Sequence, residues 1–115
     1  MNKFIALLLF VFSVSAYANA PIEVGNISLL QIHNNPTSTS NSAQRFIVKL
    51  NGSVSTSSCG SSDFWTGALD NDAGRAQYSA ILAAATSNKP IKLQGTAPNS
   101  CLSGNILIRN VYVVW

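Results

Sequence analysis

The sequence predicts a single domain that is mainly β with one helix, in the order β-β-β-α-β-β. Three observations lead to this prediction. Apolar and polar residues alternate along several short segments, an alanine-rich segment has helical spacing instead, and turn-forming residues separate these segments. At 115 residues the chain has the length of one domain.

The first two strands are separated by a long polar loop. Residues 22–33 are rich in β-forming residues, and their apolar parity shifts after Gly25-Asn26, which indicates a bulge or a strong bend. The polar loop spans residues 34–44, and residues 45–55 then alternate between the two faces of a second strand. Its inward residues are predicted to be Phe46, Val48, Leu50 and Val54.

A short third strand over residues 63–69 leads into the helix. Asp70 or Asp72 is suited to cap the first turn of the helix, and Asn88 followed by Pro90 is suited to end it. The apolar stripe that should face the sheet consists of Tyr78, Ile81, Leu82 and Ala85.

The fourth strand is predicted over residues 91–95, with Ile91 and Leu93 pointing inward. The fifth strand is predicted over residues 105–115 and is apolar on both faces. Five strands with a helix between the third and the fourth have the connectivity of the OB fold, a partly open five-stranded Greek-key barrel. An α+β sandwich with one helix packed across it is the alternative.

The first 18 residues are predicted to be a signal peptide, and residues 19–115 the single OB-like domain. Lys3 supplies a positive start, residues 4–14 are an apolar stretch too short to span a bilayer, and Ala16-Tyr17-Ala18 has the small-x-small pattern of a cleavage site. We expect cleavage after Ala18, because the next candidate site would place Pro21 beside the cleaved bond. A membrane anchor or a buried first helix is the alternative. The mature protein should therefore be secreted or periplasmic, without a membrane span.

Charge argues against a nucleic-acid partner. The whole chain has a net charge of +3, and loss of Lys3 with the leader leaves +2. This charge is small and scattered, whereas proteins that bind nucleic acid concentrate positive charge on one face.

The two cysteines, Cys59 and Cys101, both lie outside the leader. In an oxidising compartment, two cysteines in a small domain are most simply one disulfide. A metal site or a redox pair is the alternative, but the chain has no C-x-x-C spacing and only one histidine.

Residues with catalytic chemistry are few. His33 lies at the end of a predicted strand and is expected to be a surface residue. Asp70 and Asp72 could hold Ca²⁺, but helix capping explains them and the EF-hand pattern is missing. We therefore expect no enzyme activity, no cofactor and no metal.

Residues suited to binding are more abundant. Trp65, Tyr112 and Trp115 offer flat apolar faces with a polar edge, which can stack on a sugar ring. A tryptophan in a third strand is more often a core residue, Tyr112 could equally belong to the core, and Trp115 is the least constrained of the three. We predict these three as weak glycan contacts. The basic residues Arg45, Lys49 and Lys92 are expected to lie on solvated strand faces.

Three runs carry a resemblance to a known family. They are Phe64-Trp65-Thr66-Gly67-Ala68-Leu69, the helical segment from Ala73 to Leu82, and Asn88-Lys89-Pro90-Ile91-Lys92-Leu93. They resemble the B subunit of subtilase cytotoxin and its small secreted relatives, and the segments 25–33 and 46–52 fit the same pattern. The resemblance implies a five-stranded OB-like barrel of the bacterial toxin B-subunit type. It further implies a pentameric ring, a host glycan as ligand and a separate catalytic subunit as partner. The family's N-terminal sugar-contact segment has no equivalent here, so no contact residue is transferred from it.

Self-association is expected on independent grounds. The fifth strand has apolar residues on both faces, and the helix carries small residues beside its main apolar stripe. Good helix propensity also explains the alanines, so this inference has an alternative. The interface is predicted to include Val111, Val113, Ala76, Ala80 and Ala83.

The function that these observations favour is a secreted, non-catalytic binding subunit that recognises a glycan as an oligomer. The alternative is a secreted or periplasmic structural or interaction protein with the same fold and no glycan binding. A nucleic-acid-binding OB domain is the least favoured class.

Overall fold

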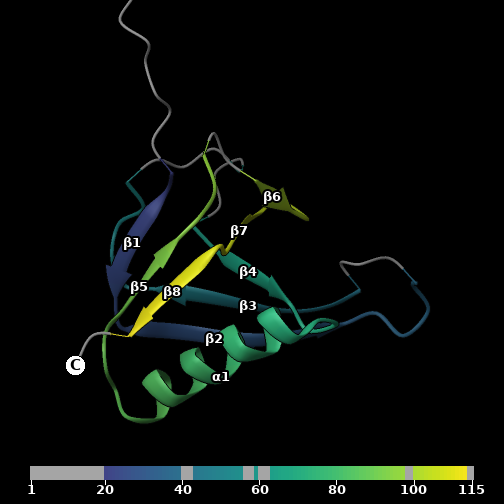
Figure 1. The fold of residues 1–115 in the computed structure, drawn as a ribbon, viewed down its shortest axis with the longest axis horizontal. Helices are drawn as coiled ribbons and strands as arrows, with labels where there is room; N and C mark the ends of the chain where they lie inside the picture. The colour runs from purple at the N-terminus through teal and green to yellow at the C-terminus, as the bar shows by residue number, and fades with distance from the viewer. Residues whose placement is uncertain (1–19, 40–42, 56–58, 60–62, 98–99, 114–115) are drawn as a thin grey trace, which may run out of the picture.

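The computed structural model describes residues 20–39, 43–55, 59, 63–97 and 100–113. These residues form a mainly β fold with one helix, as the sequence predicts (Figure 1). In chain order the elements are β1 (Ile22–Gly25), β2 (Ile27–Asn34), β3 (Gln44–Leu50), β4 (Trp65–Ala68), α1 (Asp72–Thr86), β5 (Ile91–Gln94), β6 (Cys101–Leu102), β7 (Asn105–Leu107) and β8 (Asn110–Val113).

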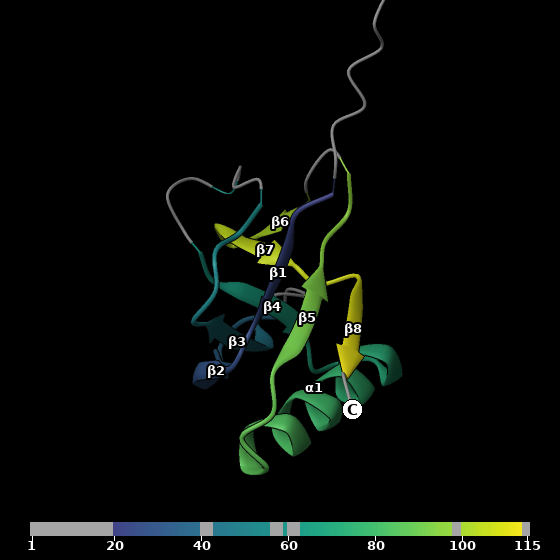
Figure 2. The same cartoon turned by 90° about the vertical axis from the view of Figure 1, so that its left-hand side faces the viewer.

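The strands make two sheets. One has the order β1-β5-β8 and is antiparallel throughout. The other has the order β2-β3-β4-β7-β6, and its only parallel pair among the described residues is β4 with β7. Figures 1 and 2 show α1 lying across one end of both sheets.

Two bent segments connect the sheets. β1 and β2 are separated only by Asn26, and β7 and β8 only by residues 108–109, yet in each case the two strands belong to different sheets. The predicted bend at Gly25-Asn26 is confirmed. Asn26 and Asn51 hold it through two hydrogen bonds, of 2.9 and 3.0 Å. A Cβ atom at Gly25 would lie 2.7 Å from Asn51 Oδ1, which is why the bend requires glycine.

The second bent segment corrects the prediction of one continuous fifth strand. Ile108 donates its backbone N–H to Thr66 in the five-stranded sheet, and Arg109 donates to Gln94 in the other sheet. The side-chain alternation changes at this transfer. Ile106 and Ile108 are buried, and beyond the break Val111 and Val113 face the same interior while Tyr112 faces outward. The apolar pattern on both faces therefore reflects a change of sheet within the segment.

The helix has the predicted place but a different cap. Asn71, between the two predicted aspartates, is the N-cap residue, and its side chain accepts a 2.7 Å hydrogen bond from the Gly74 N–H. Ile81 and Ala84 are buried, whereas Leu82, predicted to face the sheet, is 40 % exposed. Asn88 adopts a positive φ of 52° just before Pro90, as the predicted helix end requires.

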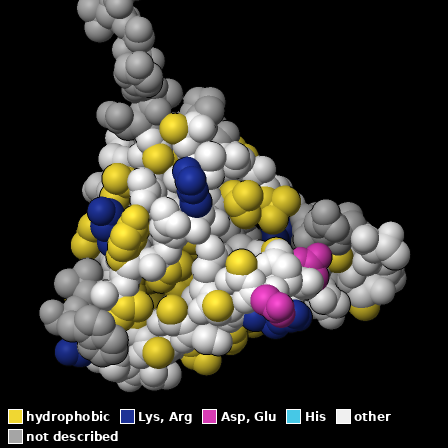
Figure 3. All heavy atoms as spheres, viewed as in Figure 1, with side chains coloured by type: hydrophobic (Ala, Val, Ile, Leu, Met, Phe, Trp, Pro, Cys, Tyr) yellow, Lys and Arg dark blue, Asp and Glu magenta, His cyan; other side chains and the backbone are white. Residues whose placement is uncertain are grey.

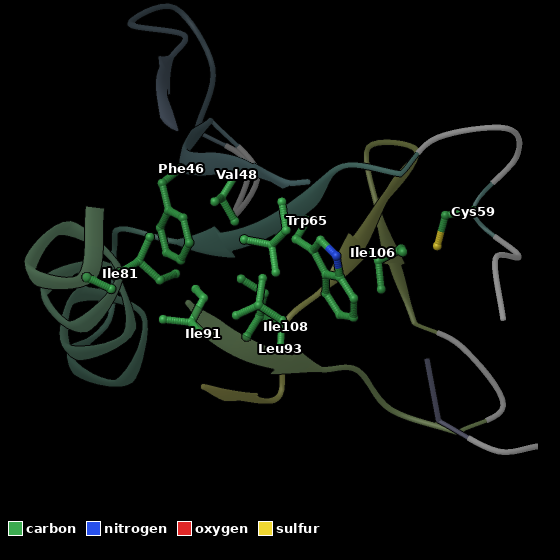
Figure 4. Close-up of a cluster of buried hydrophobic side chains, with 11 residues drawn as sticks. Phe46, Val48, Cys59, Trp65, Ile81, Ile91, Leu93, Ile106 and Ile108 are labelled. Atoms are coloured by element: carbon green, nitrogen blue, oxygen red, sulfur yellow. The ribbon is translucent and has the colours of Figure 1, made fainter. Parts of the chain in front are cut away.

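The core lies between the sheets and the helix. Figure 4 shows Phe46 and Ile81 at its helix end, Trp65 in the middle, and Ile106 and Cys59 at the far end. Of the four residues predicted to point inward from the second strand, Phe46, Val48 and Leu50 are buried on β3. Val54 lies beyond the end of β3 and is half-buried against the core. Arg45 and Ile47 on the other side of β3 are buried as well, so the expectation of a solvated Arg45 is wrong. β3 lies between β2 and β4, so that cross-strand neighbours flank its outward side chains on both sides.

Candidate binding groove

The structure separates the three aromatic residues that were predicted to contact a glycan. Tyr112 on β8 is 42 % exposed, whereas Trp65 on β4 is 0 % exposed. A fully buried indole cannot stack on a ligand, so the prediction for Trp65 is wrong. Trp115 lies outside the described residues.

Tyr112 borders a groove between α1 and β8, which we call the helix–strand groove. Its volume is about 500 Å³, a size typical of small-ligand sites. Figure 3 shows hydrophobic side chains gathered between these two elements, with acidic side chains only toward the N-terminal end of α1. The lining residues are Ala73, Ala76, Gln77 and Ala80 from α1, and Arg109, Asn110, Val111 and Tyr112 from the opposite wall.

Small helix residues create the hollow. Ala73, Ala76 and Ala80 recur at helical spacing, so that the face of α1 toward β8 presents methyl groups around the single longer side chain of Gln77. Gln77 links α1 to the opposite wall of the groove, because its Nε2 donates a 3.1 Å hydrogen bond to the Arg109 carbonyl oxygen. The helix and the strand are thereby fixed at this separation.

The Tyr112 ring is held in place by its neighbours on the three-stranded sheet. Its hydroxyl donates a 3.0 Å hydrogen bond to Gln94 Oε1, and Asn110 Nδ2 donates to the same oxygen at 3.3 Å. Lys92 Nζ lies 4.8 Å from the ring centroid, which is a cation–π contact. An aromatic side chain held this way loses little entropy when a ligand stacks on it.

The groove continues around the N-terminal end of α1. A second hollow of about 230 Å³ shares Ala73 and Gln77 with it. A third hollow, of about 380 Å³, shares Ala68, Asn71 and Leu107 with the second. Consecutive hollows with common lining residues form one continuous surface around this end of α1.

The lining determines what chemistry the helix–strand groove can perform. Among the described residues that line it, none carries a carboxylate, an imidazole or a thiol. The polar groups are one guanidinium, two side-chain amides and one phenol, which donate and accept hydrogen bonds. In the described ranges of the chain, no group of three or more His, Cys, Asp or Glu residues could hold a metal ion. The groove is suited to binding.

Trp65 has a structural role instead. Its Nε1 donates a 2.9 Å hydrogen bond to Glu23 Oε1, and the Glu23 side chain on β1 is only 1 % exposed. Burial raises the pKa of Glu23 above its ordinary value of 4.5, and the nearby charge of Asp63 raises it further. The hydrogen bonds from Trp65 and from the Gly52 backbone, together with Lys49, act in the opposite direction. The sequence did not single out Glu23.

The residues predicted to form an oligomer interface share one surface only in part, because Val111, Ala76 and Ala80 line the helix–strand groove and Val113 and Ala83 do not. Val111 and Val113 are half-buried and face the interior, and Val111 packs on the core. Ala76 and Ala80 line the helix–strand groove, whereas Ala83 is exposed and outside its lining.

The disulfide between Cys59 and Cys101 is confirmed, with their Cα atoms 5.6 Å apart. Cys59 is buried in the core cluster, and Cys101 is exposed on β6. The bond therefore ties the segment before β4 to the segment before β7. It does not line the groove, so its role is structural.

Sequence reasoning missed Arg109, Gln77 and Gln94. Arg109 marks the point where the chain changes sheets, and the polar pair Arg109-Asn110 inside an apolar run was the available signal. Gln77 and Gln94 gave no comparable signal, because their roles depend on partners 32 and 18 residues away.

None of the described helices is long and apolar enough to cross a membrane. No protein-family model, no curated protein and no solved structure matches the chain.

Proposed function

We propose that this protein is a secreted, non-catalytic binding subunit that recognises a linear glycan through the helix–strand groove. The observation that carries the proposal is Tyr112, an exposed aromatic ring held in a fixed orientation at the wall of a groove with amide and guanidinium groups. Sugar rings stack on such aromatic faces, and their hydroxyls pair with neutral donors and acceptors. Because adjoining hollows extend the groove, the proposed ligand is a chain of several sugar units.

The proposed architecture is an OB-type barrel of the toxin B-subunit kind. The strand series β2-β3-β4-β7 continues through residues 108–109 into β8-β5-β1, and β1 leads back to β2 through Asn26. In a partly open barrel the strands form one continuous curved sheet. If the strand pairing is interrupted at each of two bends, the same strands are divided into two sheets that are joined by the bent segments. The resemblance to the subtilase cytotoxin B-subunit family supports the same proposal, and with it a pentameric ring and a separate catalytic subunit.

Export through the leader at residues 1–18 is part of the proposal. The Cys59–Cys101 bond supports it, because such bonds persist in oxidising compartments and are rare in reducing ones.

A protein-interaction role without glycan binding is the second candidate, and β2 favours it. This strand is at the edge of the five-stranded sheet and carries Leu29, 40 % exposed, and Ile32, 51 % exposed. Exposed apolar side chains on an unpaired strand edge are typical of surfaces that pair with another chain.

A glycan array with the mature protein separates the two candidates. We expect binding that strengthens along a series of linear glycans of increasing length and falls at least tenfold in Tyr112→Ala. Ala76→Arg should block binding because its long side chain would fill the groove. The matched control is Ser79→Arg, which adds the same side chain at an exposed position of α1 outside the groove lining and should bind normally. A folded protein that binds no glycan on the array would leave only the interaction role.

A further inference from the structure

Glu23 is a buried carboxyl group with no part in the helix–strand groove. It lies on β1, pairs with Leu93 of β5, and points into the interior between the two sheets. Its hydrogen bond to Trp65 connects β1 of the three-stranded sheet with β4 of the five-stranded sheet. The contact therefore joins the two layers of the fold directly.

The surroundings of this carboxyl group contain little compensating charge. On the β3 side is Lys49, whose Nζ lies over the Phe64 ring at 5.4 Å. Asp63, just before β4, adds a like charge. From β5 the paired residue is apolar Leu93, and from the loop after β3 the neighbour is Gly52, where an added Cβ would lie 3.2 Å from Glu23 Cγ. Within the described residues, Glu23 forms no ion pair.

We infer that Glu23 and Trp65 form an acid-responsive junction, which holds β1 against β4 more tightly as the pH falls. A buried carboxylate without a cationic partner disfavours the closed state, because opening would return its charge to water. Protonation removes that cost. The added proton can occupy one carboxyl oxygen while the other still accepts from the indole N–H, so that the junction is retained.

β1 is the element whose local opening should change when Glu23 is protonated. It has only four residues, is at the edge of its sheet, and is otherwise held by pairing with β5 and by hydrogen bonds between Ile22 and Ser55. Short edge strands are the parts of a fold that open locally at low cost.

The direction of the pH effect follows from linkage. Burial raises the pKa of Glu23 in the folded protein above its ordinary value of 4.5. The stability that this group contributes is then fully present below pH 4.5 and is lost as the pH rises through the raised value. The junction is thus predicted to be tightest in acid and loosest at neutral pH.

Amide hydrogen exchange of β1 tests this inference, with each rate divided by that of an unfolded chain at the same pH. Protection of the β1 amides should rise several-fold from pH 8 to pH 4. In Glu23→Gln, which keeps the acceptor for Trp65 but cannot titrate, protection should be constant over this range and near the acid level of the natural protein. His33→Asn, a control for the only histidine, should retain the full pH dependence. An unchanged pH dependence in Glu23→Gln would overturn the inference.

A second measurement covers the case in which Glu23→Gln fails to fold. Direct titration of the Glu23 carboxyl carbon by NMR in the natural protein should give a midpoint above 4.5, and the Trp65 indole N–H signal should shift with the same midpoint. A midpoint at or below 4.5 would contradict the inference. Neither result depends on whether the protein binds a glycan.

Discussion

Trp65 and Tyr112 form the same kind of contact in opposite surroundings. Each is an aromatic residue that donates one hydrogen bond to a side-chain Oε1 on a neighbouring strand, Trp65 to Glu23 at 2.9 Å and Tyr112 to Gln94 at 3.0 Å. Trp65 is 0 % exposed and Tyr112 is 42 % exposed. The buried pair joins two sheets, while the exposed pair orients a ring beside a groove. Burial, more than residue type, distinguishes a structural aromatic residue from a candidate binding residue.

The largest expected effect is on the buried side of this comparison. Trp65→Ala should lower the free energy of unfolding by about 3–5 kcal/mol, because it removes the largest core side chain and leaves a cavity beside Glu23. Urea unfolding measures this loss. A loss below about 1 kcal/mol would show that the Trp65 region is not the centre of the core.

Removal of the disulfide should cause the second-largest loss in the free energy of unfolding. The bond closes a sequence separation of 42 residues and anchors Cys59 in the same core cluster as Trp65. Replacing both cysteines with alanine is expected to cost about 2–4 kcal/mol, chiefly by freeing the unfolded chain. Glycan binding by the fraction that remains folded should be unchanged, since neither cysteine lines the groove. Reduced affinity at full folding would indicate that the bond shapes the groove.

The Trp65–Glu23 and Tyr112–Gln94 pairs can be compared directly by removing the acceptor side chain of each. Glu23→Ala leaves the buried Trp65 N–H without its acceptor, and we expect a loss of about 1–3 kcal/mol at pH 5, where the carboxyl group is more favourable than at neutral pH. Gln94→Ala removes the acceptor of an exposed phenol that water can replace, and should cost about 0.5 kcal/mol or less. Equal losses in thermal or urea unfolding would contradict the assigned difference between the two pairs.

The smallest effect on stability is expected at Tyr112 itself. Tyr112→Ala should change the free energy of unfolding by about 0.5 kcal/mol or less, because the ring covers little of the core. Tyr112→Phe keeps the ring but loses the bond to Gln94, and should bind glycan with an affinity between those of the natural protein and Tyr112→Ala. If Tyr112→Ala unfolds the protein, the residue belongs with Trp65 as a structural aromatic.

Local pattern predicted most of the elements. The alternation of Phe46, Val48 and Leu50 located β3 and its inward face, and the parity shift at Gly25-Asn26 located the first bend. Both features are determined by residues that are close in sequence, and a local sequence pattern records such residues directly. The second bend at residues 108–109 was missed because an unbroken apolar run obscures a change of sheet.

The candidate site was less predictable than the fold. Tyr112 and the alanines of α1 were identified separately, one as a glycan contact and the others as an interface, and the structure brings them into one groove. Their proximity follows from the packing of α1 across the ends of the sheets, which no local pattern encodes. Trp65 was misassigned for the related reason that a four-residue strand does not reveal which of its faces is covered.

The central claim is that the helix–strand groove binds a glycan. The most direct test is NMR titration of the mature protein with the linear glycan that binds most strongly on the array, following the side-chain amide signals of Gln77 and Asn110 on opposite walls of the groove. We predict that both signals shift in proportion to occupancy and that neither shifts in Ala76→Arg. A bound glycan that leaves both signals unchanged, or that shifts only signals from β2, would contradict the account.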